Sequence, residues 1–376
     1  MAAEPKTTTD HPAALASTSA PVPTESDVYD RQIRLWGADA QSKMSSAQVL
    51  YINTTGISSE ILKNLVLAGV HASIADGRTY PDAMAHTPSS FLPSRERLVL
   101  NKEREVEKSI PEAQDDTQNK KEENGRDTKK MKKMTVARAM APCIEELNPL
   151  LPKCEINEEK DIESIPAEFL KQFDIIIASQ ISLQQATYIT KSTATSDGKK
   201  AKFYLVHSFG FFSCALVDLG ANHEYRQEIG KELSDIQTVK DYLTLEEMMS
   251  VKLCDVKDRW HKNGPPIIYA KFRSILHYYS VKKAWPDEKN VSDFIQVTKE
   301  FLVQQGLKED YIGDDSDLGR LSVTATAEVS PVCAVLGGVL GNEVIKAISG
   351  RGEPANNILL FDGLDGGCKS FTLKKP

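Results

Sequence analysis

Residues 48–76 read QVLYINTTGISSEILKNLVLAGVHASIAD and contain, in order, the patterns of a strand, a turn, a helix and a second strand. The apolar run at 49–52 predicts the first strand, and aliphatic residues recur at helical spacing over 57–66. Gly69 suits the end of this helix, and residues 72–75 form a second short apolar run. A strand, a glycine-containing turn, a helix and another strand begin a Rossmann-like parallel sheet, so we predict an α/β fold.

The turn between the first strand and the helix occupies the place of a dinucleotide-binding loop. Such a loop needs glycines, because side chains would keep phosphate away from the backbone N–H groups. Here only Gly56 remains, while Asn53 and Ser58 occupy positions that glycines should hold. Asp76 ends the second strand, where an acidic side chain can bind ribose, but aspartates at strand ends also serve as turns and caps. We therefore interpret the loop as degenerate and expect it to bind no nucleotide.

The α/β pattern continues after a charged segment. A helix is predicted over 136–147, strands at 153–157, 174–179, 202–206, 212–219, 358–361 and 370–373, and a more helical, polar region over 225–326. The pattern at 174–179 is apolar without alternation, which is typical of a parallel strand that is covered on both faces. We therefore expect a mostly parallel sheet with helices on both faces.

A long helix is predicted before the last two strands. Ser330 is a suitable N-cap, Pro331 fits the first helical position, and Gly350 can end the helix. Three glycines within it, Gly337, Gly338 and Gly341, each cost roughly 1 kcal/mol of helix propensity. Their presence indicates that another backbone packs closely against this helix.

Two segments have no hydrophobic period that would support a packed structure. Residues 1–26 are rich in Ala, Thr, Ser and Pro, and residues 101–133 are dominated by charges of both signs. We predict a disordered tail and a disordered surface insertion. The insertion ends in Lys129-Lys130-Met131-Lys132-Lys133, which is either a nuclear import signal or a solvated lysine cluster. On the first interpretation the protein is expected in the nucleus and also in the cytoplasm.

The composition narrows the possible functions. A net charge of −7 gives no reason to expect nucleic acid or an anionic membrane as a partner, and no apolar run reaches the roughly 18 residues of a membrane helix. The six cysteines form no Cys-x-x-Cys pair, so we expect neither a zinc site nor another metal site, and no disulfide framework. The chain has no recognisable nucleophile signature and no phosphate-loop lysine. A Rossmann-like sheet with these features suggests the partner of an enzyme rather than a complete enzyme.

Several segments resemble one known family. Residues 29–37, YDRQIRLWG, resemble the opening signature of the ubiquitin-like activating enzymes, whose adenylation domains have a Rossmann-like, ThiF/MoeB-type fold. Four further segments resemble the first helix, the end of a later helix, the closing helix and the following strand of that fold: 59–70, 146–149, 330–348 and 357–363. The resemblance implies one adenylation-type domain over 27–376, interrupted by the insertion at 101–133 and the helical region at 225–326.

Enzymes of this family pair two homologous halves. One half binds ATP and the tail of the modifier, and it carries the thioester cysteine and the zinc-binding cysteines. This chain lacks those cysteines and has a broken loop, so it resembles the degenerate half, and its length and signatures resemble the smaller half of the heterodimeric enzymes that activate SUMO. The resemblance implies that the catalytic subunit binds ATP and Mg, that the SUMO C-terminus is adenylated and passed to that subunit's cysteine, and that the SUMO-conjugating enzyme is an indirect partner.

The resemblance assigns chemistry to one residue of this chain. In the degenerate half, the first arginine of the Tyr-Asp-Arg-Gln signature reaches the partner's ATP, and that position is Arg31. A guanidinium there would offset the charge that develops as pyrophosphate leaves, whereas the alternative is a local salt bridge. Arg34 is interpreted as structural and Trp36 as a core or interface anchor. The sequence departs from the family at Gly77-Arg78, which stand where the active half has a second acid.

Three other functions remain open at this point. A self-sufficient enzyme of the sulfur-carrier adenylating type would explain the arginine signature, but the broken loop opposes it. A pure scaffold subunit would have the fold without any catalytic residue. An NAD-dependent oxidoreductase would require the missing glycines.

Overall fold

The computed structural model describes residues 25–80, 134–194, 200–229, 232–240, 242–256 and 264–374. Most of the tail and all of the insertion that we predict to be disordered lie outside these ranges, as does the lysine cluster at 129–133. Helix α1 (Glu25–Trp36) begins at residue 25, so residues 25 and 26, the last two of the predicted tail, belong to it.

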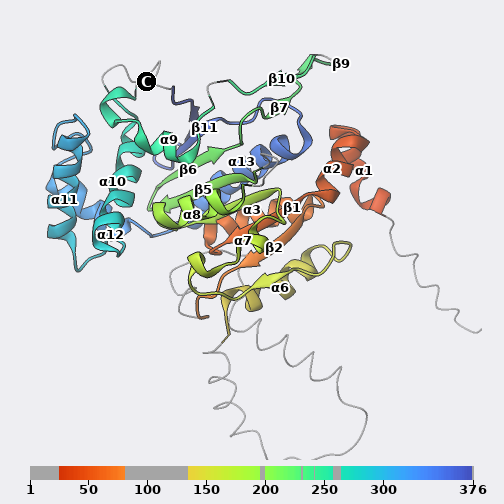
Figure 1. The fold of residues 1–376 in the computed structure, drawn as a ribbon, viewed down its shortest axis with the longest axis horizontal. Helices are drawn as coiled ribbons and strands as arrows, with labels where there is room; N and C mark the ends of the chain where they lie inside the picture. Colours follow the sequence, from red (N-terminus) through yellow and green to blue (C-terminus); the bar gives the residue numbers. More distant parts are fainter. Residues whose placement is uncertain are drawn as a thin grey trace, which may run out of the picture.

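One sheet of eight strands forms the centre of the molecule (Figure 1), in the order β12-β11-β6-β5-β4-β1-β2-β3. Five strands are parallel: β1 (Gln48–Ile52), β2 (His71–Ala75), β3 (Ile156–Asn157), β4 (Ile175–Ser179) and β5 (Lys202–Phe209). Three strands extend the sheet in antiparallel fashion: β6 (Phe212–Asp218), β11 (Asn357–Asp362) and β12 (Gly367–Phe371). The predicted α/β class with a mostly parallel sheet is confirmed.

Helices cover both faces of this sheet, as predicted. Alternate residues of β1 enter two cores, because successive side chains of a strand point to opposite faces: Val49 and Tyr51 lie in one, Leu50 and Ile52 in the other. The first core contains residues of α2 (Ala38–Ser46), α3 (Gly56–Leu67), α6 (Val136–Leu147) and α13 (Ser330–Ser349). The second contains residues of α7 (Ala167–Leu170), α8 (Leu183–Ser192), α9 (Leu245–Ser250), α10 (Ile267–Lys282), α11 (Val291–Gln304) and α12 (Asp315–Thr324).

Several predicted boundaries differ from the structure. Of the strand predicted at 153–157, only Ile156–Asn157 pairs with the sheet, and the last strand ends at Phe371 instead of 373. The region at 225–326 does contain α9 to α12, but it begins with small antiparallel pairs, β7 (Glu224–Tyr225) with β10 (Gln237–Thr238) and β8 (Glu228–Ile229) with β9 (Glu232–Leu233). These strands are too short to leave a recognisable pattern in the sequence.

Helix α13 packs along α3 through two of its glycines. A Cβ at Gly337 would lie 2.5 Å from the Cβ of Glu60, and a Cβ at Gly341 would lie 3.2 Å from the Cβ of Asn64. At Gly338 no atom lies within 4 Å of that position, so the predicted close approach holds for two of the three glycines. The helix begins with Val329 as its N-cap, which puts Ser330 one position further into the helix than predicted.

By length and composition alone, α13 could cross a membrane, and it is the only described helix of which this is true. Many of its apolar residues, including Leu336 and Leu340, are buried in the core against α3 and the sheet. A helix at the centre of a packed domain has the same composition, and this burial accounts for it.

Candidate functional site

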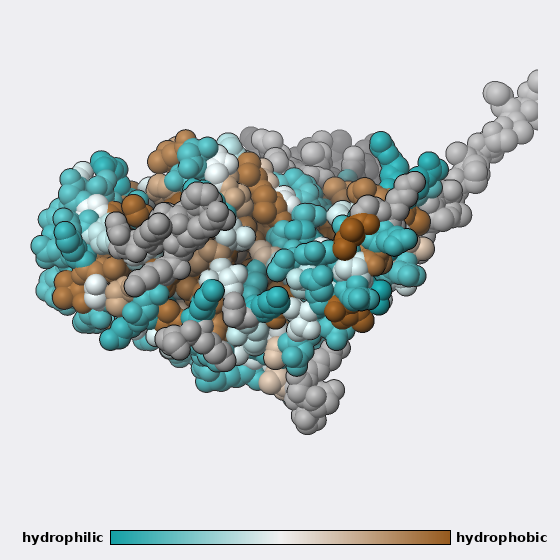
Figure 2. All heavy atoms as spheres, turned by 90° about the horizontal axis from the view of Figure 1, so that it is seen from above, coloured by the Kyte–Doolittle hydropathy of each residue, from teal (hydrophilic) through white to brown (hydrophobic). Residues whose placement is uncertain are grey.

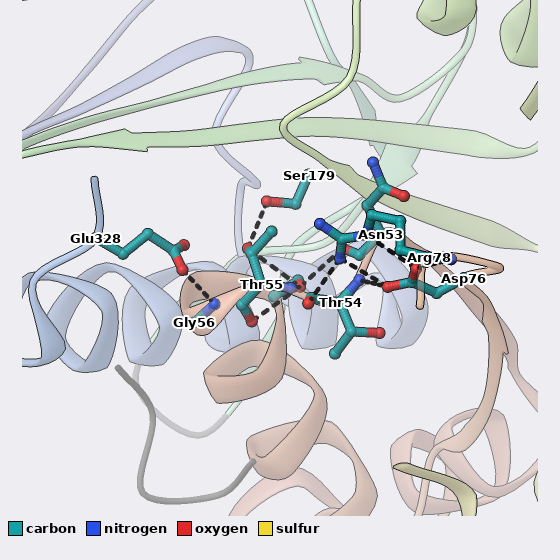
Figure 3. A network of polar contacts seen from close by, with 9 residues as sticks. Asn53, Thr54, Thr55, Gly56, Asp76, Arg78, Ser179 and Glu328 are labelled. Atoms are coloured by element: carbon teal, nitrogen blue, oxygen red, sulfur yellow. Dashed lines mark hydrogen bonds and ion pairs between the residues drawn. The ribbon is translucent and has the colours of Figure 1, made fainter. Parts of the chain in front are cut away.

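The N-terminus of α3 is capped by a carboxylate from a distant part of the chain (Figure 3). The N–H groups of Gly56 and Ile57 donate to the two oxygens of Glu328, over 2.6 and 3.1 Å. The first N–H groups of a helix have no partner within the helix and lie at the positive end of its dipole, so this is where Rossmann-like folds hold phosphate. In this chain Glu328 occupies that position.

Gly56, the one glycine of the loop, leaves the space that the Glu328 carboxylate occupies. A Cβ at Gly56 would lie 2.8 Å from Oε2 of Glu328 and 3.2 Å from Sγ of Cys333, so a side chain there would push the carboxylate away. Glu328 is buried, and burial raises its pKa against the lowering effect of the two N–H donors and of the Arg78 charge. The glycine that suggests a phosphate loop in the sequence is therefore required by an internal contact.

The acid at the end of β2 also has internal partners. Asp76 Oδ2 accepts the N–H of Thr54 over 2.7 Å, and Arg78 donates to both carboxylate oxygens through Nε and Nη2, over 2.9 and 2.7 Å. Nη2 of Arg78 also donates to the carbonyl of Thr54 over 3.0 Å, and the Asp76 side chain is fully buried. This carboxylate therefore holds the loop and Arg78 together, and its oxygens are not presented to a ribose.

The two residues that replace glycines keep the turn in shape. Asn53 has φ of 58°, in the left-handed region that asparagine tolerates better than most residues. Oγ of Ser58 accepts the N–H of Thr55 over 2.8 Å, and Oγ1 of Thr55 lies 2.6 Å from Oγ of Ser179 at the end of β4. Asn53 and Ser58 thus lie together in a closed turn, whose N–H groups donate hydrogen bonds to other groups of the same chain.

Sequence reasoning missed the two side chains that close this site. Glu328 lies 272 residues from Gly56 in the sequence and belongs to no local motif. Arg78 was noticed only as a departure from the family, although a cation two residues after a buried acid is a signal for a local ion pair.

Arg31 lies away from this loop, at the other end of α3. It is exposed and makes no hydrogen bond or ion pair with the residues that the structure describes. The local salt bridge that we considered for it is made by Arg34 instead, whose Nη2 lies 2.9 Å from Oδ2 of Asp30. Trp36 is partly buried and packs against the core that contains α3, as expected of a core anchor.

The loop and α1 are separated by the length of α3. The side chain of Gln32 on α1 bonds to the carbonyl of Leu67, at the C-terminal end of α3, whereas Gly56 begins the helix. At 1.5 Å per residue these ends are roughly 17 Å apart. Arg31 and the degenerate loop of the same chain therefore do not form one site.

Four of the cysteines have thiols whose pKa is raised by burial. All six are free, and burial raises the pKa of Cys154 to about 12. Burial also raises the pKa of Cys214, Cys333 and Cys368 above the usual value for a thiol. A nucleophilic cysteine needs the opposite shift. Within the ranges that the structure describes, no group of three or more His, Cys, Asp or Glu side chains could hold a metal ion.

Several curated proteins similar to this chain are named as subunit 1 of a SUMO-activating enzyme. No protein-family model matches the chain. SUMO-activating enzyme subunit 1B-1 of Arabidopsis thaliana is 29% identical to it, over 91% of this chain and 94% of its own length. SUMO-activating enzyme subunit 1 of Danio rerio is 26% identical, and that of Homo sapiens is 28% identical, each over 91% of this chain and 93% of its own length. These relatives confirm the resemblance that the opening and closing signatures indicate.

Proposed function

Because the chain is similar over nine-tenths of its length to proteins named SUMO-activating enzyme subunit 1, we propose that it is the non-catalytic subunit of a heterodimeric SUMO-activating enzyme. The main evidence for a non-catalytic role is the closed loop, in which Glu328 occupies the position at the N-terminus of α3 where phosphate would bind. The chain acts together with a catalytic subunit, which adenylates the C-terminal carboxylate of SUMO and then accepts it on a cysteine.

ATP and Mg belong to the catalytic subunit in this proposal. The residues of this chain's own loop do not fit a nucleotide, because the N–H groups of Thr54, Gly56 and Ile57 already have carboxylate acceptors. A phosphate at α3 would have to displace Glu328 and would meet its negative charge. The closed loop also disfavours a self-sufficient adenylating enzyme and an NAD-dependent oxidoreductase.

The chain's own chemical contribution is Arg31. During adenylation an oxygen of the SUMO carboxylate forms a bond to the α-phosphorus of ATP, and the bond between that phosphorus and the bridging oxygen breaks as pyrophosphate leaves. A guanidinium near the leaving phosphates stabilises the charge that develops on them. Arg31 suits this role because it is exposed, has no acceptor among the described residues and lies on α1, which contacts the end of α3 opposite to the loop, so it is available to a partner.

Exchange between ATP and pyrophosphate by the assembled heterodimer tests this role. Arg31→Ala should slow the exchange by roughly 10- to 1,000-fold, on the order of 1.4–4 kcal/mol. Arg31→Lys should restore only part of the rate, because an ammonium lacks the planar fork of a guanidinium. Arg34→Ala is the matched control, since Arg34 is also exposed but already paired with Asp30. If an intact Arg31→Ala heterodimer exchanges ATP and pyrophosphate at the wild-type rate, Arg31 has no catalytic role and the chain is a scaffold subunit.

The lysine cluster at 129–133 is the feature of the sequence that bears on where the protein acts in the cell. We propose that this segment directs the subunit to the nucleus, with a further pool in the cytoplasm. Replacing its four lysines with glutamine should move a fluorescent fusion into the cytoplasm while leaving heterodimer formation unchanged. A fusion that stays nuclear would mean that import depends on another segment or on the partner.

A further inference from the structure

The C-terminal end of α3 is capped by amide side chains from three other parts of the chain. The last carbonyls of a helix have no partner within the helix and need other donors. The three bonds are Asn148 Nδ2 to Val66 O (2.7 Å), Gln32 Nε2 to Leu67 O (3.2 Å) and Gln41 Nε2 to Ala68 O (3.1 Å). Consecutive residues of one helix end are thus tied to α1, to α2 and to the segment after α6.

Tyr29 joins this cap to α1. Its hydroxyl accepts a second hydrogen bond from Asn148 Nδ2, over 2.8 Å, and the residue is only 1% exposed. Its ring lies against Gly69, which has φ of 89°; a Cβ there would be 2.9 Å from Cζ of Tyr29 and 3.0 Å from Nε2 of Gln41. Both conformation and space therefore require a glycine at this position. We call Tyr29, Gln32, Gln41 and Asn148 the amide clamp.

The clamp determines which way Arg31 faces. Residues two positions apart in a helix point in nearly opposite directions, because each residue turns by about 100°. Burial of Tyr29 therefore directs Arg31 outward. Val28 and Leu35 lie three residues before and four after Arg31, on the same outer face, and their side chains are 47% and 68% exposed. With no partner for Arg31 among the described residues, the reach of its guanidinium depends on the backbone position that the clamp sets.

We propose that the amide clamp is a positioning device that holds Arg31 at the distance and angle needed in the partner's adenylation site. This inference rests on the role of Arg31 proposed above. Displacing a catalytic group by about 1 Å can cost on the order of 100-fold in rate, so small losses of anchoring should be visible in the chemistry. Tyr29, Gln32, Gln41 and Asn148 contact no reacting atom in this arrangement and act only through α1.

Two substitutions in the full heterodimer test the clamp. Asn148→Ala removes the bonds to both Tyr29 and Val66 and should slow exchange between ATP and pyrophosphate by roughly 5- to 50-fold at saturating ATP. Tyr29→Phe keeps the ring against Gly69 and removes only the hydroxyl, so it should fold normally and slow exchange by a smaller factor. Asn356→Ala is the control, because Asn356 also donates an amide to a carbonyl, that of Lys240 over 2.7 Å, but far from α1 in the sequence.

The decisive measurement repeats both substitutions in the Arg31→Ala background. If the clamp acts through Arg31, neither substitution should slow the residual exchange further, because no guanidinium remains to be positioned. Equal slowing in both backgrounds, or wild-type exchange in both clamp variants while Arg31→Ala is slow, would overturn the inference. Wild-type exchange by Arg31→Ala itself would overturn the proposed role of Arg31 and this inference with it, so the two failures are distinguishable.

Discussion

Glu328 places a carboxylate where nucleotide-binding relatives of this fold place phosphate. Its two oxygens accept two consecutive N–H groups, so it reproduces the geometry that the helix N-terminus offers to an anion. The negative charge is buried, which costs free energy, but the donors and the nearby Arg78 offset part of that cost. The contact also joins the loop after β1 to the segment before α13.

Replacing Glu328 with alanine should therefore destabilise the isolated chain. The N–H groups of Gly56 and Ile57 would lose their acceptors, and each buried, unsatisfied donor costs about 1–3 kcal/mol. We expect a loss of about 2–4 kcal/mol in the free energy of unfolding, measured by chemical denaturation. Glu328→Gln should lose less, because its amide retains one acceptor oxygen. The control is Glu288→Ala at an exposed position. A loss below about 0.5 kcal/mol, typical of surface changes, would contradict the capping role.

His207 makes stability depend on pH. It is fully buried beside the rings of Phe272 and Trp285, Nε2 donates to the carbonyl of Ala325 over 2.7 Å, and burial lowers its pKa to about 4. The unfolded chain, with a histidine pKa of about 6.5, takes up this proton first as the pH falls. Stability should therefore fall between pH 6.5 and pH 4, by up to about 3 kcal/mol.

Denaturation at a series of pH values checks this prediction. His207→Gln should show a smaller fall over the same window, because the glutamine cannot be protonated there. His223, whose pKa is also lowered to about 4 by burial, remains in both proteins, so the difference between the two curves reports His207. Parallel curves would show that this residue does not contribute.

At the scale of elements, the pairing of α3 with α13 organises the domain. Gly337 and Gly341 lie against Glu60 and Asn64, so these glycines are used inside the chain. Their fit brings the two helix axes close together, which large side chains would prevent. Of the three glycines within α13, only Gly338 has open space beside it.

The two adjacent glycines form a matched pair for experiment. Gly337→Ala should destabilise the chain by about 1–3 kcal/mol, because its Cβ would overlap Glu60 and the backbone of α3 would have to move. Gly338→Ala should stabilise it by about 0.5–1 kcal/mol, because alanine has the higher helix propensity and meets no atom there. Thermal unfolding of the isolated chain measures both. Changes of the same sign and size would mean that α3 and α13 are not in this contact.

At the scale of the whole molecule, apolar side chains remain exposed where α1 lies. Figure 2 shows apolar groups among hydrophilic ones at the end of the molecule that carries α1 and α2 in Figure 1. Val28 and Leu35 are exposed on the same helix face as Arg31. If Arg31 enters the partner's site, these two side chains must be covered by the partner, and their burial would exclude water around the guanidinium.

Val28→Ser together with Leu35→Ser should therefore weaken heterodimer formation. We expect at least about a tenfold rise in Kd, because two exposed aliphatic side chains would no longer be buried on binding. The fold itself should be unaffected, since both residues are exposed. Val303→Ser is the control: Val303 is 59% exposed on α11, which lies at the opposite end of the molecule. An unchanged Kd measured by sedimentation would place the partner on another face.

The sequence by itself determined the fold class, the order of the main strands and helices, and the weakness of the nucleotide loop. Each of these depends on residues that are close together along the chain. The run at 49–52, the helical spacing over 57–66 and the missing glycines at Asn53 and Ser58 can all be read locally, because periodicity and steric fit act over a few residues. The very short strands β7 to β10 could not be predicted, since two residues have no periodicity.

Tertiary structure alone decided why the loop is closed and how Arg31 is held. Glu328 meets Gly56 across 272 residues, and Asn148 meets Tyr29 across 119. Neither pair can be recognised from the local sequence pattern. A hydrogen bond depends on distance and direction in space, and these are set only when the sheet and its helices pack. The sequence shows that the loop lacks the glycines that phosphate binding requires. Only the folded chain shows that the carboxylate of Glu328 accepts the N–H groups that phosphate would otherwise bind.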